Sequence, residues 1–104
     1  MGGLVVGDGI LTEHVRVALH TSLDWADYVF ADDYKLMPLN KVAEYVKANN
    51  HLPDVPSAED VKKEGIDLGS MDAKLLQKIE ELTLYVIQQD KRIDEMQKKL
   101  DEKK

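Results

Sequence analysis

The most regular hydrophobic pattern of the chain lies between residues 75 and 100, where apolar residues recur at alternating steps of four and three. The heptad positions a and d of this stretch are Leu75, Ile79, Leu82, Val86, Gln89, Ile93, Met96 and Leu100. About four consecutive heptads predict a coiled coil. Because one helix cannot bury such a stripe in water, we expect these residues to form an interface between copies of the chain.

The pattern leaves the number of copies open between two and three. β-Branched residues at a with Leu at d favour two strands, as in parallel dimers. Between residues 75 and 87 the stripe is wider, because Leu76, Leu84, Tyr85 and Ile87 join it, and this breadth favours a higher order. The additional apolar residues also predict a second surface that packs on the helix, supplied by the region around residues 25–30 and by short helices. Gln89 at d predicts a polar layer that fixes the register.

The pattern at the start of the chain differs from that of the helix. Residues 4–19 are rich in β-branched side chains and are interrupted by Gly7-Asp8-Gly9, a sequence typical of turns. This predicts two short strands, the second running from Ile10 to Leu19 with Val15, Val17 and Leu19 on one side.

The middle of the chain predicts a small globular part. Aromatic residues gather between Trp25 and Phe30, and a helical pattern runs from Lys41 to Asn49, ending at an Asn-Asn pair suited to a left-handed stop. The expected core residues are Trp25, Tyr28, Phe30, Val42, Tyr45 and Val46.

Prolines and capping residues set the boundaries of the predicted elements between residues 51 and 70. Pro53 and Pro56 predict an extended strap over residues 51–56. Ser57 with Asp60 predicts the start of a short helix that Gly65 ends, and Ser70 is the expected N-cap of the long helix. The predicted fold class is therefore α+β, with a strand segment over 1–22, a globular part over 23–69 and a coiled-coil helix over 70–104.

Composition narrows the function classes. The net charge of -6 argues against nucleic acid as a partner, and no stretch reaches the roughly 20 apolar residues of a bilayer-spanning helix, so no membrane insertion is expected. The chain has no cysteine, which excludes disulfides and thiolate chemistry. The opening Met1-Gly2-Gly3 suggests a trimmed edge, so we expect a C-terminal part of a longer protein.

Candidate chemical sites are weak. Asp24, Asp27, Asp32 and Asp33 form an acidic cluster, but their spacing does not match a calcium loop. The three histidines His14, His20 and His51 lack the spacing of a zinc site. No nucleophile and base pair is evident. We therefore expect no enzyme, no metal and no cofactor.

An ordered series of segments between residues 25 and 93 resembles the C-terminal region of bacterial and phage tail-fibre-type proteins. The segments are WADYVF (25–30), YKLMPL (34–39), HLPDVPS (51–57), GIDLG (65–69) and LLQKIEELTLYVI (75–87). The resemblance implies a parallel homotrimer at the end of a β-rich fibre, extracellular or on a virion, with a structural, non-enzymatic role. A coil that registers three chains also implies a role in folding the upstream shaft, as an intramolecular chaperone.

Two alternative functions remain. One is a fibre tip that binds a cell-surface glycan or receptor, with Tyr34 and Lys35 as candidate ligand contacts. The other is an autocleaving chaperone of the endosialidase type, which uses a Ser-Asp step and a nearby lysine. The sequence Ser22-Leu23-Asp24 lacks the direct Ser-Asp step, and Ser57 and Ser70 are expected at helix caps.

Overall fold

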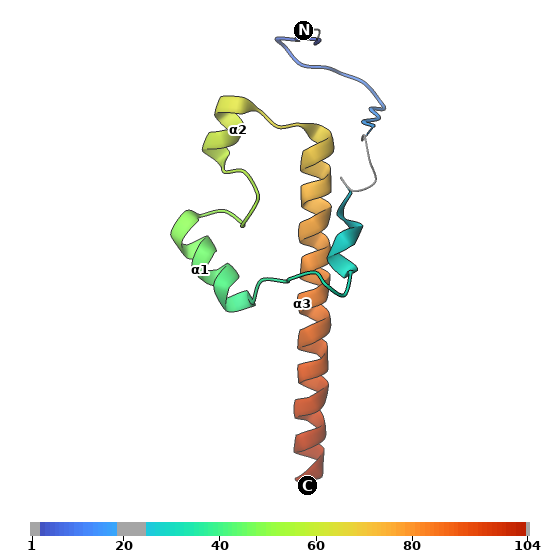
Figure 1. Cartoon of the computed structure of the whole chain (residues 1–104), viewed down its shortest axis with the longest axis vertical. Helices are drawn as coiled ribbons and strands as arrows, with labels where there is room; N and C mark the ends of the chain where they lie inside the picture. Colours follow the sequence, from blue (N-terminus) through green and yellow to red (C-terminus); the bar gives the residue numbers. More distant parts are fainter. Residues whose placement is uncertain (1–2, 19–24, 104) are drawn as a thin grey trace.

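The computed structural model describes residues 3–18 and 25–103. The molecule is elongated, with extents of 69 × 31 × 29 Å. Its elements are the 3-10 helix η2 (Ala26–Phe30) and the α-helices α1 (Leu39–Asn49), α2 (Ala58–Glu64) and α3 (Leu68–Glu102). The end of the predicted second strand at Leu19, His20, Ser22, Asp24 and Lys104 lie outside the described residues. Figure 1 shows that α3 runs along most of the molecule, that the N-terminal segment extends beyond the start of α3 and that the other helices lie beside its N-terminal half.

The predicted long helix is confirmed, but it begins two residues earlier than expected. α3 has 35 residues and is therefore about 52 Å long. Its N-cap is Asp67, whose side chain accepts a hydrogen bond from the backbone N–H of Ser70 at 2.9 Å. Ser70 is thus the third residue of the helix, so its prediction as the cap is wrong. Asp and Ser cap helices about equally well, and the first of the two along the chain takes the role here.

The ends of α2 and the C-terminal end of α1 lie where the sequence predicts them, whereas α1 begins at Leu39, two residues before the predicted start at Lys41. α2 begins with a capping box in which Asp60 N donates to Ser57 Oγ at 3.2 Å and Ser57 N donates to Asp60 Oδ2 at 3.3 Å, and it ends at Gly65. α1 ends at Asn50, which has a left-handed conformation with φ 61°. The strap between the helices contains a turn and no regular helix, as its prolines require.

The α+β prediction is wrong, because the described part of the chain contains helices and no β-strand. Residues 3–18 are exposed throughout, so the segment predicted as strands over 1–22 forms no sheet where the structure describes it. The physical reason is that a strand needs a partner for its backbone hydrogen bonds. β-Branched composition is only a weak preference when no second strand pairs with the segment.

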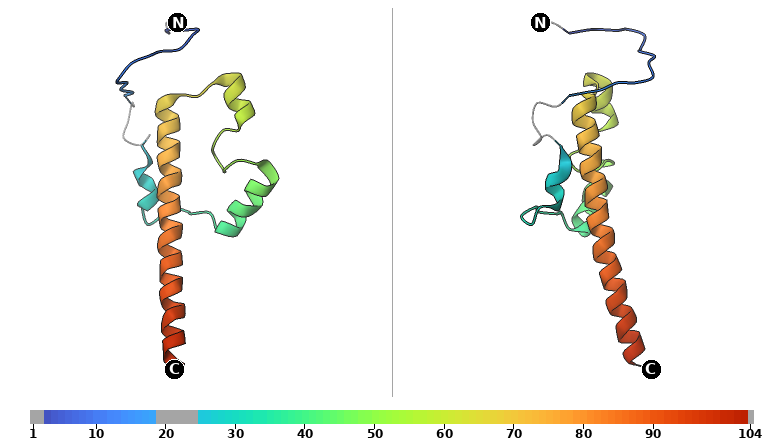
Figure 2. Two further views of the ribbon diagram at one scale, coloured as in Figure 1. Left: turned by 180° about the vertical axis from the view of Figure 1, so that it is seen from behind. Right: turned by 90° about the vertical axis from the view of Figure 1, so that its right-hand side faces the viewer.

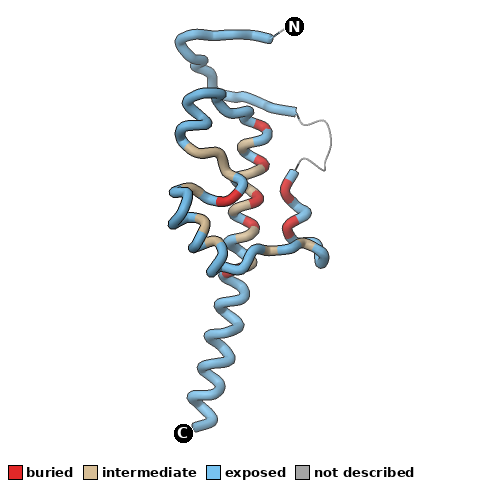
Figure 3. The backbone as a smooth tube through the Cα atoms, turned by 60° about the vertical axis from the view of Figure 1, so that its left-hand side comes forward, coloured by how far each residue is buried: buried red, intermediate tan, exposed pale blue. Residues whose placement is uncertain are grey.

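The best-packed contact lies between η2 and α3. It buries the small residues of η2, with Ala26 at 0% and Val29 at 1% exposure. The aromatic side chains Trp25, Tyr28 and Phe30 keep 40–52% of their surface exposed, so they do not fill the core of the single chain as expected. Small side chains at the contact allow the two backbones to approach closely, and this displaces the larger rings to the outside. Figure 3 shows the buried positions of both elements facing each other.

The remaining expected core residues lie on α1. Val42 and Tyr45 are half-buried, and Val46 is mostly surrounded but still exposed at its edge. α1 contains no buried residue. One apolar side of this helix is therefore only partly covered within the single chain.

Candidate oligomer interface and the groove beside it

The residues predicted as the oligomer interface form one exposed stripe on α3, which we call the seam. The seam consists of Leu75, Ile79, Leu82, Val86, Gln89, Ile93, Met96 and Leu100. Its apolar members keep 46–61% of their surface exposed, and Gln89 is exposed as well. At 3.6 residues per turn, these positions fall within an arc of about 100°. The structure thus brings the predicted residues together on one face of the helix.

The seam extends one heptad further towards the N-terminus than predicted. Leu68 lies seven residues before Leu75, at another d position, and its side chain is 54% exposed. The sequence carried this signal, but the expected cap at Ser70 placed Leu68 outside the helix.

A different face of α3 is covered by its own chain. The buried helix residues Gly69, Ala73, Gln77 and Glu80 lie roughly opposite the seam, on the side where η2 packs. The wide apolar set between residues 75 and 87 therefore divides into a covered face and an exposed face. In the view from behind in Figure 2, α3 lies in front, with η2 on one side and α1 on the other.

A crossing segment, residues 31–38, joins η2 to α1 over the face of α3 turned to the viewer in Figure 1. Two tyrosines fasten it to the helix. The hydroxyl of Tyr34 donates to Glu81 Oε2 and accepts from Gln77 Nε2 at 3.1 Å. The hydroxyl of Tyr85 donates to the backbone carbonyl of Met37. Each contact joins residues more than forty positions apart in the sequence, so together they hold the crossing segment against α3.

The polar cluster around Tyr34 is completed by a lysine. Lys78 Nζ donates to Glu81 Oε1 at 3.2 Å and lies 4.0 Å from Asp54 Oδ2 on the strap. Burial, followed by the hydrogen bond to Glu81, raises the pKa of Tyr34 to about 12. The phenol therefore stays protonated and remains the donor in its contact with Glu81 at neutral pH.

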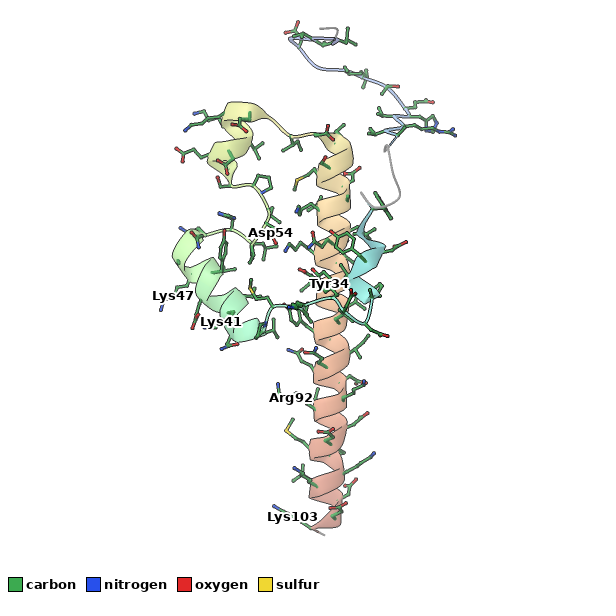
Figure 4. All side chains as sticks on the ribbon, in the orientation of Figure 1. Tyr34, Lys41, Lys47, Asp54, Arg92 and Lys103 are labelled. Atoms are coloured by element: carbon green, nitrogen blue, oxygen red, sulfur yellow. The ribbon has the colours of Figure 1, made fainter. Side chains whose placement is uncertain are left out.

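An apolar cavity of 230 Å³ lies between α3, the crossing segment and the region formed by α1 and the strap. We call this cavity the groove, and we call residues 39–56 the arm. The groove is lined by Tyr34, Lys35, Met37, Leu39, Val42, Leu52, Pro53, Asp54, Lys78, Glu81, Leu82 and Tyr85. The candidate ligand contacts Tyr34 and Lys35 are thus brought to one cavity. Figure 4 shows Tyr34 at α3 and Asp54 on the strap, with Lys41 and Lys47 along α1.

Glu80 is buried where η2 covers α3. Its Oε1 atom has no hydrogen-bond partner among the described residues. Burial, and to a smaller extent the charge of Asp27, raises the pKa of the Glu80 carboxyl above its ordinary value of 4.5. Sequence reasoning did not identify this residue, because its position at b in the heptad is typical of a solvated charge.

The candidate metal ligands do not gather in the part of the chain that the structure describes. No group of three or more His, Asp or Glu side chains there is arranged to hold an ion. Asp27, Asp32 and Asp33 are exposed, and the His51 ring packs edge-on against Tyr45 with ring centroids 5.5 Å apart. Within the described ranges, no helix is both long and apolar enough to span a bilayer.

Comparison with protein families, with curated proteins and with solved structures finds no match for this chain. The resemblance to tail-fibre-type proteins therefore remains a prediction from the sequence, and the function is inferred from the seam and the groove.

Proposed function

We propose that this chain is a homotrimerisation module, in which three α3 helices pair in parallel along the seam and hold the copies in register. The observation that carries the proposal is the exposure of the seam. Seven apolar side chains at heptad spacing keep 46–61% of their surface exposed, although the same helix buries another face against η2. An apolar stripe of this length on a soluble helix is typical of a coiled-coil interface.

Charge at the positions beside the seam favours a parallel arrangement. The g positions include Lys78, Arg92 and Lys99, and in an antiparallel pair g positions face g positions. Cations would then face cations. In a parallel arrangement Lys78 faces Thr83 and Arg92 faces Gln97 at the e positions of the neighbour, so the repulsion between these cations is avoided.

Three copies agree with the breadth of the interface. Leu76 at e is only half-buried within the chain and adds carbon surface next to the seam, and three helices cover more of such flanking positions than two. Gln89 side chains from three copies would meet in one layer and satisfy one another by hydrogen bonding, which selects one register.

The module fits best at the end of an elongated, tail-fibre-like protein. The N-terminal segment lies beyond one end of α3 and the C-terminus lies at the other, as Figure 1 shows. Polypeptide that precedes residue 3 would therefore continue along the axis of the coil. Registration of three chains at this end would also aid the folding of an upstream shaft.

Disulfide trapping tests the proposal cleanly, because the native chain has no cysteine. Leu100→Cys places a thiol on the seam, so oxidation should link chains in pairs if the helices are parallel and in register. Lys98→Cys is the matched control, because position f faces away from the partners and its thiols lie too far apart to bond. Equal cross-linking of the two variants, or none in Leu100→Cys, would contradict the parallel seam.

A further inference from the structure

The outer surface of η2 presents aromatic rings. At three residues per turn, the buried residues Ala26 and Val29 share the side that faces α3. Tyr28 and Phe30 therefore lie on opposite flanks of η2, and the N-cap residue Trp25 precedes them. All three rings keep 40–52% of their surface exposed. Because Trp and Tyr are among the commonest anchors of protein interfaces, three exposed rings within six residues indicate a binding surface.

The assembly proposed above does not cover this surface. η2 packs on the side of α3 that lies roughly opposite the seam, over buried residues that include Ala73 and Glu80. Figure 1 shows the arm on the other side of α3 from η2. The rings are therefore exposed on the outside of the molecule, both in the single chain and in a coil that forms through the seam.

The residues beside the rings are acidic. Asp27, Asp32 and Asp33 are exposed, and none of them forms an ion pair within the described ranges. Residues 25–34 contain no lysine, arginine or histidine, and Lys35, the first basic residue after them, lines the groove. We call the exposed surface of residues 25–33 the η2 face. Its carboxylates are thus available to a cation from outside the chain.

The surroundings of Tyr28 add to this negative charge. Burial raises the pKa of the Tyr28 phenol above its ordinary value of 10.0, and nearby carboxylates add to the effect. These carboxylates are those of Glu81, Glu80 and Asp54. Lys78 already pairs with Glu81 and Asp54, whereas the buried Oε1 atom of Glu80 has no hydrogen-bond partner in the described part of the chain. The region under the η2 face therefore supplies acceptors and leaves its own lysine engaged.

The Tyr28 ring is held in place by a second tyrosine. The ring centroids of Tyr28 and Tyr34 are 5.9 Å apart, with an angle of 41° between the ring planes. Tyr34 is itself fixed to α3 through Glu81 and Gln77. A ring that is already ordered loses less conformational freedom when a partner binds, so this arrangement favours binding.

We propose that the η2 face binds a basic polypeptide segment of a partner protein, with arginine side chains against the rings and the aspartate carboxylates. A guanidinium group stacks on aromatic rings and pairs with carboxylates, so it matches both features of this surface. A neutral glycan would use the rings alone and would leave the carboxylates without an opposite charge. In a trimer the coil would display three such faces outwards, and a long basic segment would gain avidity by contacting more than one.

Peptide titration of the full-length chain tests the proposal. Trp25 is the only tryptophan, so its fluorescence reports directly on the η2 face. The probe is a synthetic peptide of alternating Arg and Gly, and peptides of equal length with Lys or Gln in place of Arg are the controls. We expect a saturable change with the Arg peptide, weaker binding of the Lys peptide and none of the Gln peptide, with an affinity that falls as salt rises.

The other outcomes of this titration contradict the proposal. Equal affinity for the Arg and Gln peptides would exclude the role of charge, and equal affinity for the Arg and Lys peptides would exclude stacking of the guanidinium. A response to maltohexaose without one to the Arg peptide would replace the basic partner by a glycan. No response to any of these probes would overturn the η2 face as a binding surface.

Paired variants locate the binding. Tyr28→Leu removes one ring and should weaken binding of the Arg peptide about two- to fivefold, which is the effect of one exposed cation–π contact. Asp32→Asn combined with Asp33→Asn should also weaken it. Asp94→Asn combined with Glu95→Gln makes the same change of charge on an exposed part of the coil and should not. Equal weakening by the two double variants would indicate general attraction to an acidic protein and would exclude a specific face.

The seam variant Ile79→Asp separates this proposal from the proposed function. The η2 face is exposed in the single chain, so the dissociated variant should bind the Arg peptide with unchanged affinity per chain. Loss of binding in Ile79→Asp would contradict a face that is complete within one copy. A monomeric mass for the unchanged chain, with the Arg peptide still bound, would contradict the trimer and leave the η2 face intact.

Discussion

Ile79→Asp is the perturbation whose effect follows most directly from the structure. Ile79 lies in the N-terminal half of α3, beside which the other helices pack, and its side chain is 57% exposed in the single chain. Full burial of an isoleucine side chain is worth about 1.5–3 kcal/mol, so covering the exposed part contributes about 1–2 kcal/mol per chain. Three copies meet in one layer of a trimer. The variant should therefore lose about 3–5 kcal/mol of assembly free energy from carbon burial alone.

Every 1.4 kcal/mol changes an equilibrium constant tenfold, so this loss weakens association by about two to four orders of magnitude. Three carboxylates in one buried layer add a further desolvation cost. Sedimentation equilibrium over a concentration series measures the effect. Gln88→Asp is the matched control, because Gln88 is exposed and points away from the seam, while the helix propensity of the new residue is the same. If Ile79→Asp sediments like the unchanged chain, Ile79 does not lie in the interface.

Four further variants test the packing and the N-terminal end of α3. Asp67→Ala should lower the free energy of unfolding by about 0.5–2 kcal/mol, because it removes the N-cap acceptor. Ser70→Ala should have little effect, since Ser70 contributes only its backbone N–H to the cap. Urea denaturation measures the free energy of unfolding of both variants. Tyr85→Phe should cost about 0.5–1.5 kcal/mol in the same assay, because the part-buried hydrogen bond to the carbonyl of Met37 is lost. Unaltered unfolding of Tyr85→Phe would remove the anchor role of this hydroxyl. The pKa of Glu80 is raised in the folded chain, so the stabilisation from its protonation is full below pH 4.5 and is lost as pH rises through the raised value. Glu80→Gln should flatten this pH dependence of stability and raise the melting temperature at pH 7. A pH profile identical to that of the native chain would contradict the assignment.

Helix ends were predictable where short-range hydrogen bonds decide them. Ser57 and Asp60 close a capping box within four residues, and Asn50 and Gly65 adopt conformations with positive φ that end their helices. None of these contacts depends on a distant part of the chain. The start of α3 was misplaced because Asp67 and Ser70 are both good caps, and the pattern alone does not rank them.

Features that depend on distant contacts were not predictable. The valines between residues 5 and 17 favour strands, but they lack a pairing partner in the described chain. The aromatic cluster marked the right segment for packing on α3, yet the burial of Ala26 and Val29 depends on how closely η2 approaches the helix. Tyr34 was singled out as a ligand contact, whereas its hydroxyl is engaged by Gln77 and Glu81.

The seam was predictable residue by residue, because heptad spacing places a and d positions on one face of any helix. The groove was not, because it combines the strap, α1 and the g side of α3, which come together only in the folded chain. Its relation to the seam depends on Leu82, which belongs to both.

Molecular mass in solution, measured by light scattering over the micromolar range, tests the assembly through the seam most directly. We expect a constant mass of three times the 11.8 kDa of one chain. Twice that value would keep the pairing of helices but contradict the trimer. A single chain mass of 11.8 kDa at every concentration would contradict the assembly altogether.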